Sequence, residues 1–565
     1  MSANSVAPGA QAKRFAAYLD RLARAAEHAD RATPLKSYCT GLLLPGERKS
    51  VEPMAARLYP NNVRQAHQSM HHIVADAAWS DEDMLEAVRA YVLPQLEQKG
   101  PIVAWIVDDT GFVKKGLHSV GVTRQYCGQV GKQENCRVAV SLSVSTERAS
   151  LPIAWRLYLP EVWAKDGTRR KETGVPAEIR FQTKPAIALE QIRTAVKREI
   201  HVGVVLADAA YGTDTQFREE ITDLGLLYVV GIMSSVTVWK PGQGALPAAP
   251  WKGQGRPTKY LRRNPRHAPV PVKNLAFALP RQAWKKLSWR EGTRSPLQSR
   301  FAAVRVRPAH RDFERTEPYP EQWLLIEWPR EEAEPTKYWL ATLPAETKLK
   351  DLVRMAKHRW IIERDYEELK QELGLGHYEG RGWRGFHHHS TLCIAAYGFL
   401  VAERSRFSPS ARAGRLGLSI PKMPSQFRPR GSPRFASSDI IPARLPRSDK
   451  PSPGFFFDNS SVVLFVELHT YNTVVLGLKV KFESPGWSEF VTGDTTLALH
   501  PASDKNPAGK IELGFTVADV EAFYRDMSAK GVLFSMPPKK QDFGGVLAQF
   551  VDSEGAHCSV GAEAA

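Results

Sequence analysis

Short apolar runs alternate with helical patterns between residues 102 and 232, and this order constrains the fold more than any other feature of the chain. One helix is predicted from Pro185 onward, because proline is favoured in the first turn of a helix, and another through Phe217 and Ile221. Runs typical of strands occur at 102–107, 137–144, 151–159, 202–206 and 226–232. Three strands followed by a helix, a strand, a helix and a strand predict an α/β sheet with helices packed on it.

The first hundred residues have the spacing of helices rather than of strands. Phe15, Leu19 and Leu22 recur at helical intervals. A second helix is predicted to start at Ser80, because a serine with an acidic residue three positions later, here Asp83, matches an N-terminal cap. We therefore predict a helical N-terminal domain over residues 1–100.

Residues 234–343 differ in character from the segments on either side. They hold seven of the chain's 14 tryptophans, and short strands such as 301–306 and 323–328 alternate with turn-rich stretches. We predict a β-rich subdomain that is inserted at this point and interrupts the sheet. The core then consists of two parts, 101–233 and 344–408, and a helix predicted over 346–373 returns the chain to it.

Two acidic residues follow predicted strands of this sheet. Asp109 and Asp208 lie just past strand ends, where open α/β sheets place functional side chains. Glu363 joins them if its helix packs beside the same edge of the sheet. Three converging carboxylates repel one another unless a divalent cation lies between them, and oxygen ligands suit Mg²⁺ or Mn²⁺, which can promote phosphoryl transfer. A turn or a helix cap is the alternative role for either aspartate.

The segment around Glu363 places that carboxylate between two cations. On a helix, Arg359, Glu363 and Lys370 are spaced by four and seven residues and therefore share one face. An adjacent apolar stripe is formed by Ile362, Tyr366, Leu369 and Leu373. This arrangement suits an acid that binds metal and acts on a polyanion. An ordinary ion pair between Arg359 and Glu363 is the alternative.

Longer motifs around these residues resemble a known family, the insertion-sequence transposases of the DDE superfamily. The third acid of one branch lies in Tyr-x2-Arg-x3-Glu-x6-Lys, which this chain matches except for Ala356 at the tyrosine position. Further similarity is carried by Asp108-Asp-Thr-Gly-Phe-Val-Lys-Lys-Gly116, Arg124-Gln-Tyr-Cys-Gly128, Leu206-Ala-Asp-Ala-Ala-Tyr-Gly212 and Gly380-Arg-Gly-Trp-Arg-Gly-Phe-His-His-His389. In that family the first acid commonly precedes Thr or Ser, which favours Asp109 over Asp108.

The resemblance covers residues 12–408. It implies an RNase H-like catalytic core, a β-rich insertion, and an N-terminal region, 1–100, that binds DNA. The implied activity is DNA strand cleavage and strand transfer with Mg²⁺ or Mn²⁺. The implied partners are double-stranded DNA, both the transposon's terminal inverted repeats and the target, and a second copy of the chain in the DNA complex.

The resemblance also gives roles to individual residues. The catalytic, metal-binding acids would be Asp109, Asp208 and Glu363. Arg359 and Lys370 would hold phosphates near the scissile bond. Further candidates for contacts to the DNA backbone are Lys114, Lys115 and the basic run 256–266, for which a solvated surface charge is the alternative.

The net charge separates the body of the chain from its tail. The protein has a formal charge of +17, but from residue 455 onward it carries 8 Lys and Arg against 14 Asp and Glu. The basic body is typical of a protein that binds a polyanion, with solubility as the alternative. Five cysteines without a CxxC pair do not indicate a disulfide framework or a zinc knuckle. No apolar run approaches the roughly 20 residues that span a bilayer, so we expect a protein of the reducing cytoplasm.

The chain changes character again after residue 408. Residues 409–454 hold nine prolines and nine basic residues and are predicted to be a linker. Residues 455–565 are predicted to be a separate α+β module. Within it, residues 476–565 resemble the vicinal-oxygen-chelate superfamily of glyoxalase and bleomycin-resistance proteins, on Leu476-Gly-Leu-Lys-Val480, Ile511-Glu-Leu-Gly-Phe-Thr-Val517, Asp519-Val-Glu-Ala-Phe-Tyr524 and Phe550-Val-Asp-Ser-Glu-Gly555.

The tail departs from that family's pattern in two ways. Residues 465–476 leave too little chain for the usual first helix, and Ser559 stands where the last metal carboxylate normally lies. His500 and Glu512 are the candidate ligands that remain. Three functions therefore stay open: a DDE transposase, an inactive DNA-binding protein, and a glyoxalase-like or bleomycin-resistance-like protein that carries a transposase remnant.

Overall fold

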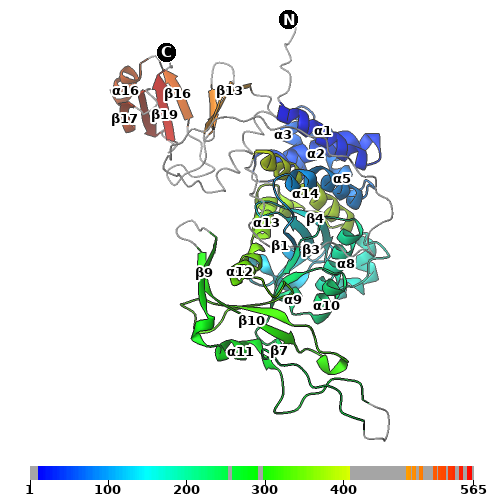
Figure 1. Ribbon diagram of the computed structural model, residues 1–565. Coiled ribbons are helices and arrows are strands. Elements are labelled where there is room, and N and C mark those ends of the chain that lie inside the picture. The colour runs from blue at the N-terminus through cyan, green and yellow to red at the C-terminus, as the bar shows by residue number, and fades with distance from the viewer. Residues whose placement is uncertain are drawn as a thin grey trace, which may run out of the picture. The chain divides into compact units, whose positions relative to one another are not determined.

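The computed structural model divides the chain into two compact units (Figure 1). The first is described over residues 10–407, apart from 47, 252–257 and 291–296. The second is described at 479–484, 487–491, 496–499, 513–517, 519–529, 532, 534–540, 546–551 and 557–562. The linker predicted at 409–454 lies outside the described residues. No helix among the described residues is long and apolar enough to cross a membrane.

Five helices precede the sheet. They are α1 (Ala10–Ala25), α2 (Ala29–Leu43), α3 (Val51–Leu58), α4 (Val63–Ala75) and α5 (Asp81–Glu97). The start of α5 confirms the predicted cap, because the Ser80 hydroxyl accepts a hydrogen bond from the backbone N–H of Asp83 at 3.1 Å.

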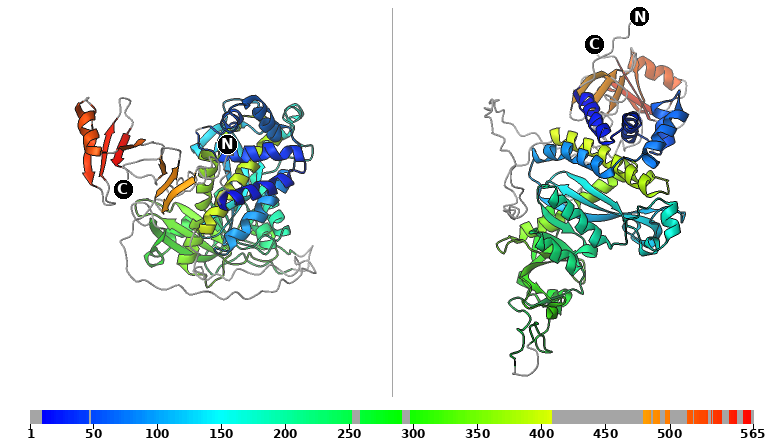
Figure 2. Two further views of the ribbon diagram at one scale, coloured as in Figure 1. Left: turned by 90° about the horizontal axis from the view of Figure 1, so that it is seen from above. Right: turned by 90° about the vertical axis from the view of Figure 1, so that its right-hand side faces the viewer.

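The long helix α14 (Trp383–Phe407) lies between these helices and the sheet (Figures 1 and 2). Phe399 on α14 packs its ring against Phe15 and Tyr18 of α1, with centroid distances of 4.8 and 5.7 Å. The Tyr18 hydroxyl also donates to the backbone oxygen of Ala395. The N-terminal helices and the sheet therefore share one hydrophobic core through α14.

A twelve-stranded sheet forms the centre of the first unit, as the α/β pattern predicted. Its strands run in the order β2-β3-β1-β5-β6-β12-β11-β10-β7-β8, and β4 pairs with β3 and β9 with β10. Strands β1, β5 and β6 are parallel to one another. The strands are β1 (Ala104–Val113), β2 (Thr123–Cys127), β3 (Lys132–Ser145), β4 (Ser150–Leu157), β5 (Val204–Ala207), β6 (Tyr228–Ile232), β7 (Thr237–Trp239), β8 (Val270–Pro271), β9 (Lys285–Arg290), β10 (Leu297–Pro308), β11 (Gln322–Trp328) and β12 (Lys337–Ala341).

The β-rich residues after β6 extend the sheet, and the predicted interruption was wrong. Strand β12 pairs antiparallel with β6, with Tyr338 opposite Ile232 and Ala341 opposite Val229. The backbone N–H and C=O groups along the edge of β6 need hydrogen-bond partners, and β12 supplies them. Strands that the sequence places in an insertion thus continue the sheet that holds the acids.

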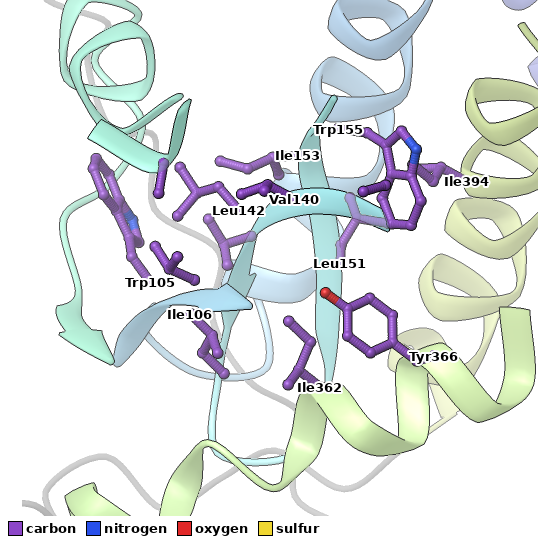
Figure 3. Close-up of a cluster of buried hydrophobic side chains, with 14 of the residues drawn as sticks. Trp105, Ile106, Val140, Leu142, Leu151, Ile153, Trp155, Ile362, Tyr366 and Ile394 are labelled. Carbon is purple, nitrogen blue, oxygen red and sulfur yellow. The ribbon is translucent and has the colours of Figure 1, made fainter. Parts of the chain in front are cut away.

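Helices cover both faces of the sheet. They are α6 (Glu161–Ala164), α7 (Gly167–Glu172), α8 (Lys184–Lys197), α9 (Ala209–Gly212), α10 (Thr215–Asp223), α11 (Val272–Ala278), α12 (Leu349–His358) and α13 (Ile361–Gln371). Ile362 and Tyr366 of α13 point toward the sheet (Figure 3). Ile362, Tyr366, Leu369 and Leu373 are all buried, which confirms the predicted apolar stripe.

The helix predicted over 346–373 is divided into α12 and α13 at Arg359 and Trp360. The backbone there makes hydrogen bonds to the third preceding residue, from Trp360 to Lys357, from Ile362 to Arg359 and from Glu363 to Trp360. Such bonds belong to the tighter 3₁₀ turn. Helical spacing in the sequence therefore predicted the right residues but missed this local change of winding.

The second unit contains two small sheets, in agreement with the predicted α+β module. One is β13 (Lys479–Ser484), β14 (Trp487–Val491) and β15 (Thr496–Leu499). The other has the order β16-β19-β18-β17, with β16 (Leu513–Val517), β17 (Phe534–Lys540), β18 (Val546–Val551), β19 (His557–Ala562) and the helix α16 (Val520–Ala529). Ser559 lies on β19, whereas His500 and Glu512 lie outside the described residues.

Two buried histidines of α14 are held as neutral rings. His387 has Nδ1 at 3.0 Å from the backbone oxygen of Trp383, and its Nε2 accepts from the N–H of Leu157. His389 has Nε2 at 3.0 Å from the backbone oxygen of Gly374 and Nδ1 at 2.8 Å from the Tyr38 hydroxyl. A neutral imidazole has one donor and one acceptor, which these partners match. Burial lowers the pKa of His389 to about 4 and also lowers the pKa of His387.

The free energy of unfolding should therefore decrease in mild acid. The unfolded imidazole has a pKa of about 6.5, so it binds a proton that the folded His389 resists, and stability is lost as the pH falls from 6.5 toward 4. The loss for one such histidine reaches about 3 kcal/mol. Urea midpoints between pH 7 and pH 5 measure it. They should fall less in His389→Gln than in the wild type or in His72→Gln, a control on the exposed side of α4. Equal slopes in all three proteins would contradict the assignment.

Candidate functional site

Two neighbouring parallel strands bring aspartates together at one level of the sheet. Ile106 of β1 pairs with Leu206 of β5, so Asp108 and Asp208, each two residues further on, lie side by side. Asp109 is the next residue of β1. The prediction that Asp109 lies past the end of its strand was wrong, because β1 continues in pairing with β3 as far as Val113. Asp208 does follow β5 directly, as predicted.

Asp108 faces the helix that carries Glu363. In the antiparallel pair of β1 and β3, Asp108 lies opposite Ser141, and opposed residues share a face of the sheet. The Ser141 hydroxyl is 2.7 Å from the hydroxyl of Tyr366 on α13. On the same face, Arg359 Nη1 donates a hydrogen bond to Asp108 Oδ2. Asp108, Arg359 and α13 therefore lie on one face.

Asp109 is held from the opposite face. Its Oδ2 accepts a hydrogen bond from Lys184 Nζ of α8 at 3.1 Å and another from the Tyr211 hydroxyl of α9 at 3.1 Å. Successive side chains of a strand point to opposite faces, which explains why the two aspartates meet different helices. Asp109 thus has both a cation and a hydroxyl as partners.

Asp208 forms the N-terminal cap of α9. Its Oδ1 accepts from the backbone N–H of Ala210 at 2.9 Å, so the alternative capping role is observed. This short helix lies directly against β6, because a Cβ atom on Gly212 would lie 2.1 Å from the backbone oxygen of Gly231. The absence of a side chain at Gly212 allows that contact, which positions Tyr211 beside Asp109.

The electrostatics of the site follow from this crowding. The pKa of Asp108 is raised to about 7, and burial is the largest cause. The Arg359 guanidinium opposes this increase, and the charges of Asp109 and Asp208 contribute to it. Burial, followed by the same three carboxylates and Tyr366, also raises the pKa of the Tyr211 hydroxyl. Three acids are close enough to repel one another, so a cation at this place lowers their energy.

Arg359 lies between the aspartates and Glu363. Beyond its bond to Asp108, its Nη2 atom is 3.5 Å from Glu363 Oε1, so the alternative ion pair also forms. The Glu363 side chain is 68% exposed, whereas that of Asp108 is 13% exposed. Glu363 therefore lies at the border of the site, on the outer side of the guanidinium.

Two lysines lie near the end of β1, beyond the aspartates: Lys114, which follows the last residue of the strand, and Lys370 of α13. Lys370 Nζ donates to the backbone oxygen of Gly111 at 2.8 Å and to Gln129 Oε1 at 3.0 Å. Burial lowers its pKa to about 8. Lys114 donates to the backbone oxygen of Tyr378 at 2.7 Å, and burial and then the charge of Arg137 lower its pKa to about 8. Lys115 is exposed.

Several groups of the site were not predicted as such. Ala356 is buried on α12 and offers no hydroxyl. On other helices, the Tyr211 hydroxyl bonds to Asp109, and the Tyr366 hydroxyl bonds to Ser141, which lies opposite Asp108. Tyr211 belongs to the quoted stretch around Asp208, so its position one helical turn later was a usable signal. Lys184 precedes Pro185 in the first turn of α8, and nothing in its local sequence marks it.

The oxygen donors of the site suit a hard divalent cation. Asp108, Asp109 and Asp208 provide only carboxylate oxygens, the ligands that Mg²⁺ and Mn²⁺ prefer. Their mutual repulsion is now offset by Arg359 and Lys184, which supply the positive charge. Among the described residues, no three His, Cys, Asp or Glu side chains are gathered as closely as a bound metal requires. A metal would therefore need Glu363 or Asp109 to move toward the other acids.

Comparison with known proteins divides the chain in the same two parts. Residues 17–296 match the family model of the DDE superfamily endonucleases, and residues 471–557 match that of the glyoxalase/bleomycin resistance protein/dioxygenase superfamily. The first match includes all three aspartates and ends before α12 and α13. A probable transposase for insertion sequence element IS701 from Microchaete diplosiphon is 30% identical over 169 residues. These are 30% of this chain and 41% of that relative.

Similar solved structures cover a small share of this chain. An NAD-dependent benzaldehyde dehydrogenase from Legionella pneumophila is 22% identical over 17% of this chain and 90% of its own, with a TM-score of 0.16. A glyoxalase/bleomycin resistance protein/dioxygenase superfamily member from Vibrio splendidus 12B01 is 14% identical over 18% of this chain and 90% of its own, with a TM-score of 0.15. Scores this low support no conclusion about this chain.

The family matches, the transposase relative and the motifs around the aspartates agree with one another. The first part of the chain is therefore similar to the DDE superfamily endonucleases, and its C-terminal part is similar to the glyoxalase/bleomycin resistance protein/dioxygenase superfamily.

Proposed function

We propose that the first unit is a transposase that cleaves and joins DNA strands with a divalent metal ion, Mg²⁺ or Mn²⁺. The observation that carries this proposal is the pair Asp108 and Asp208, side by side on neighbouring strands with a cationic side chain beside them. Carboxylates this close together repel one another, which favours a metal ion between them. DDE endonucleases use divalent metals in general. The substrates would be the terminal inverted repeats of the element and a target duplex.

We propose Asp108, Asp208 and Glu363 as the residues that hold the metal. The family pattern favoured Asp109 as the first acid. The contacts favour Asp108, because it shares a face with α13, whereas Asp109 points to the other face and is engaged by Lys184 and Tyr211. When bound there, a divalent cation activates the attacking oxygen and stabilises the leaving oxygen at phosphorus.

The chain's own groups would then have distinct tasks. Arg359 now neutralises Asp108. With a metal held by the acids, the guanidinium would be free to bind a phosphate oxygen, for which its planar fork is suited. Lys370 would bind a neighbouring phosphate as a point charge. Lys184 and Tyr211 keep Asp109 in place and thereby fix the course of β1 under the site.

Further features of the family are proposals of the same kind. An RNase H-like core is supported by the antiparallel strands β4, β3 and β1 followed by the parallel strands β5 and β6, with acids on β1 and after β5. A homodimer in the DNA complex and DNA binding by the N-terminal region, 1–100, follow from the family alone. DNA contacts of Lys114 and Lys115 are proposed from their positive charge. We propose no activity for the C-terminal unit.

Strand nicking tests the acids. The substrate is a supercoiled plasmid with the DNA that flanks this gene, incubated with Mg²⁺. Loss of a metal ligand costs several kcal/mol of transition-state stabilisation, so Asp108→Asn, Asp208→Asn and Glu363→Gln should each reduce nicking on the order of 1,000-fold. Asp109→Asn should reduce it by less than about tenfold. The exposed Asp223→Asn on α10 is the control and should nick like the wild type.

Two results would change these assignments. If Asp108→Asn is fully active and Asp109→Asn is inactive, Asp109 is the first acid, as the family pattern favoured. A folded wild type that never nicks the plasmid, yet binds it, would favour the inactive DNA-binding protein instead.

Metal binding can be measured without DNA. Mn²⁺ at 100 times its dissociation constant stabilises the folded state by about 2.7 kcal/mol if it binds only that state. Thermal unfolding of the wild type and of Asp223→Asn should shift upward with Mn²⁺, and the shift should be lost in Asp208→Asn, because one of the ligands is gone. The same shift in all three proteins would place the ion elsewhere.

Lys370 should make DNA binding depend on pH. Its pKa is lowered to about 8, so the free protein loses this charge as the pH rises from 7 to 9 and binds duplex DNA less tightly. Arginine stays charged over that range, so Lys370→Arg should show a smaller fall in affinity. Fluorescence anisotropy measures both, with Lys197→Arg on the exposed side of α8 as control. If Lys370→Arg follows the wild type at every pH, the lysine has no contact with phosphate.

A further inference from the structure

The chain between β7 and β8 carries positive charge without any acidic residue. Residues 240–270 contain seven Lys and Arg and no Asp or Glu. Figure 1 shows this segment extending from the end of the sheet that is remote from α1–α5. We call its described residues, 240–251 and 258–270, the basic arm. Of its cations the structure describes Lys240, Lys259, Arg262, Arg263 and Arg266.

A buried carboxylate fixes the base of the arm. Asp312, between β10 and β11, is 1% exposed. Its Oδ2 accepts from Trp239 Nε1 at 2.6 Å, and its Oδ1 accepts from Arg263 Nε at 2.8 Å. Within the arm, His267 Nε2 lies 2.7 Å from the backbone oxygen of Gly244. A buried charge is retained where it is paired and hydrogen-bonded, so these contacts give the arm a defined course.

The other cations of the arm face solvent. Lys240, Lys259, Arg262 and Arg266 are exposed, and none of them is paired with a carboxylate in the part of the chain that the structure describes. Tyr260, among them, is 47% exposed and has Lys259 Nζ 5.4 Å from its ring centroid. Soluble surfaces usually mix both signs of charge. Here one segment carries exposed charges of a single sign, and a polyanion is the partner that such a segment favours.

The arm is distinct from the site of the acids. The strand order places β7 five strands from β5, which Asp208 follows. Neighbouring strands lie about 4.8 Å apart, so the separation across the sheet is about 24 Å. A duplex rises about 3.4 Å per base pair, so this distance corresponds to about seven base pairs. A helix of DNA bound at the acids can therefore reach the base of the arm within one turn.

We propose that the basic arm binds the phosphate backbone of double-stranded DNA, starting about seven base pairs from the bond that the acids cut. This inference rests on the proposed function for its choice of polyanion. The arm carries charge and an exposed ring but no set of groups aimed at base edges, so the contact is independent of sequence. Its role is to orient the duplex over the acids.

The dependence of binding on salt tests the arm directly. Each phosphate contact contributes about 0.9 to the slope of log K against log salt concentration. The triple variant Lys240→Gln, Lys259→Gln, Arg266→Gln should therefore lower the slope by up to about 2.7 on a random 30-base-pair duplex, measured by anisotropy without divalent metal. Arg263 and Asp312 are left unchanged, so the base of the arm is kept.

A matched control separates this contact from the loss of net charge. The triple variant Lys171→Gln, Arg180→Gln, Lys197→Gln removes two lysines and one arginine that are exposed elsewhere in the first unit. Its slope should stay within about 0.9 of the wild type, the value of one contact. Equal slopes for the two triple variants overturn the proposal, and so does an effect of the arm variant that is confined to single-stranded DNA.

Failure of the arm can be distinguished from failure of the proposed function. If the wild type nicks DNA and the arm variant keeps its slope, only the arm proposal fails. If the wild type never nicks DNA and the salt-dependence slope of the arm variant is still lower than that of the wild type, the arm binds DNA in a protein without the proposed activity.

Discussion

Two successive aspartates of β1 tie helices on both faces of the sheet to a single strand. Asp108 is bonded to Arg359 at the junction of α12 and α13, and Asp109 to Lys184 at the start of α8. Both acids lie in largely buried surroundings, where an uncompensated charge costs several kcal/mol. Each ion pair therefore compensates the charge of one acid and links the strand to a helix on that acid's face of the sheet.

The extension of the sheet beyond β6 supports the same junction from the other side. Lys357, two residues before Arg359, donates to both carboxylate oxygens of Glu327 on β11, at 2.8 and 2.6 Å. Its ammonium group also lies 4.3 Å from the ring centroid of Trp289 on β9. Strands that are far from the acids in the sheet thus hold the last turn of α12. The β-rich residues are part of the support of the site rather than a separate attachment.

Sequence patterns predicted the features that depend on neighbours along the chain. The cap at Ser80, the position of Asp208 after β5 and the apolar stripe of α13 are local, and each agrees with the structure. The length of β1 and the pairing of β12 with β6 depend on hydrogen bonds to distant segments, so apolar runs could not reveal them. The proposed preference for Asp108 over Asp109 depends in the same way on a distant segment, because it rests on the register of β1 with β3, which no local motif records.

The position of α14 has a consequence for how such a chain can be shortened. This helix is apolar on the side of the sheet and on the side of α1 and α5, and both sides are covered. Removing residues 10–97 would leave Phe399 and its neighbours in contact with water and turn half of a core helix into an aggregation surface. Gene rearrangements that delete the beginning of this protein would therefore lower its solubility, because they uncover one side of α14.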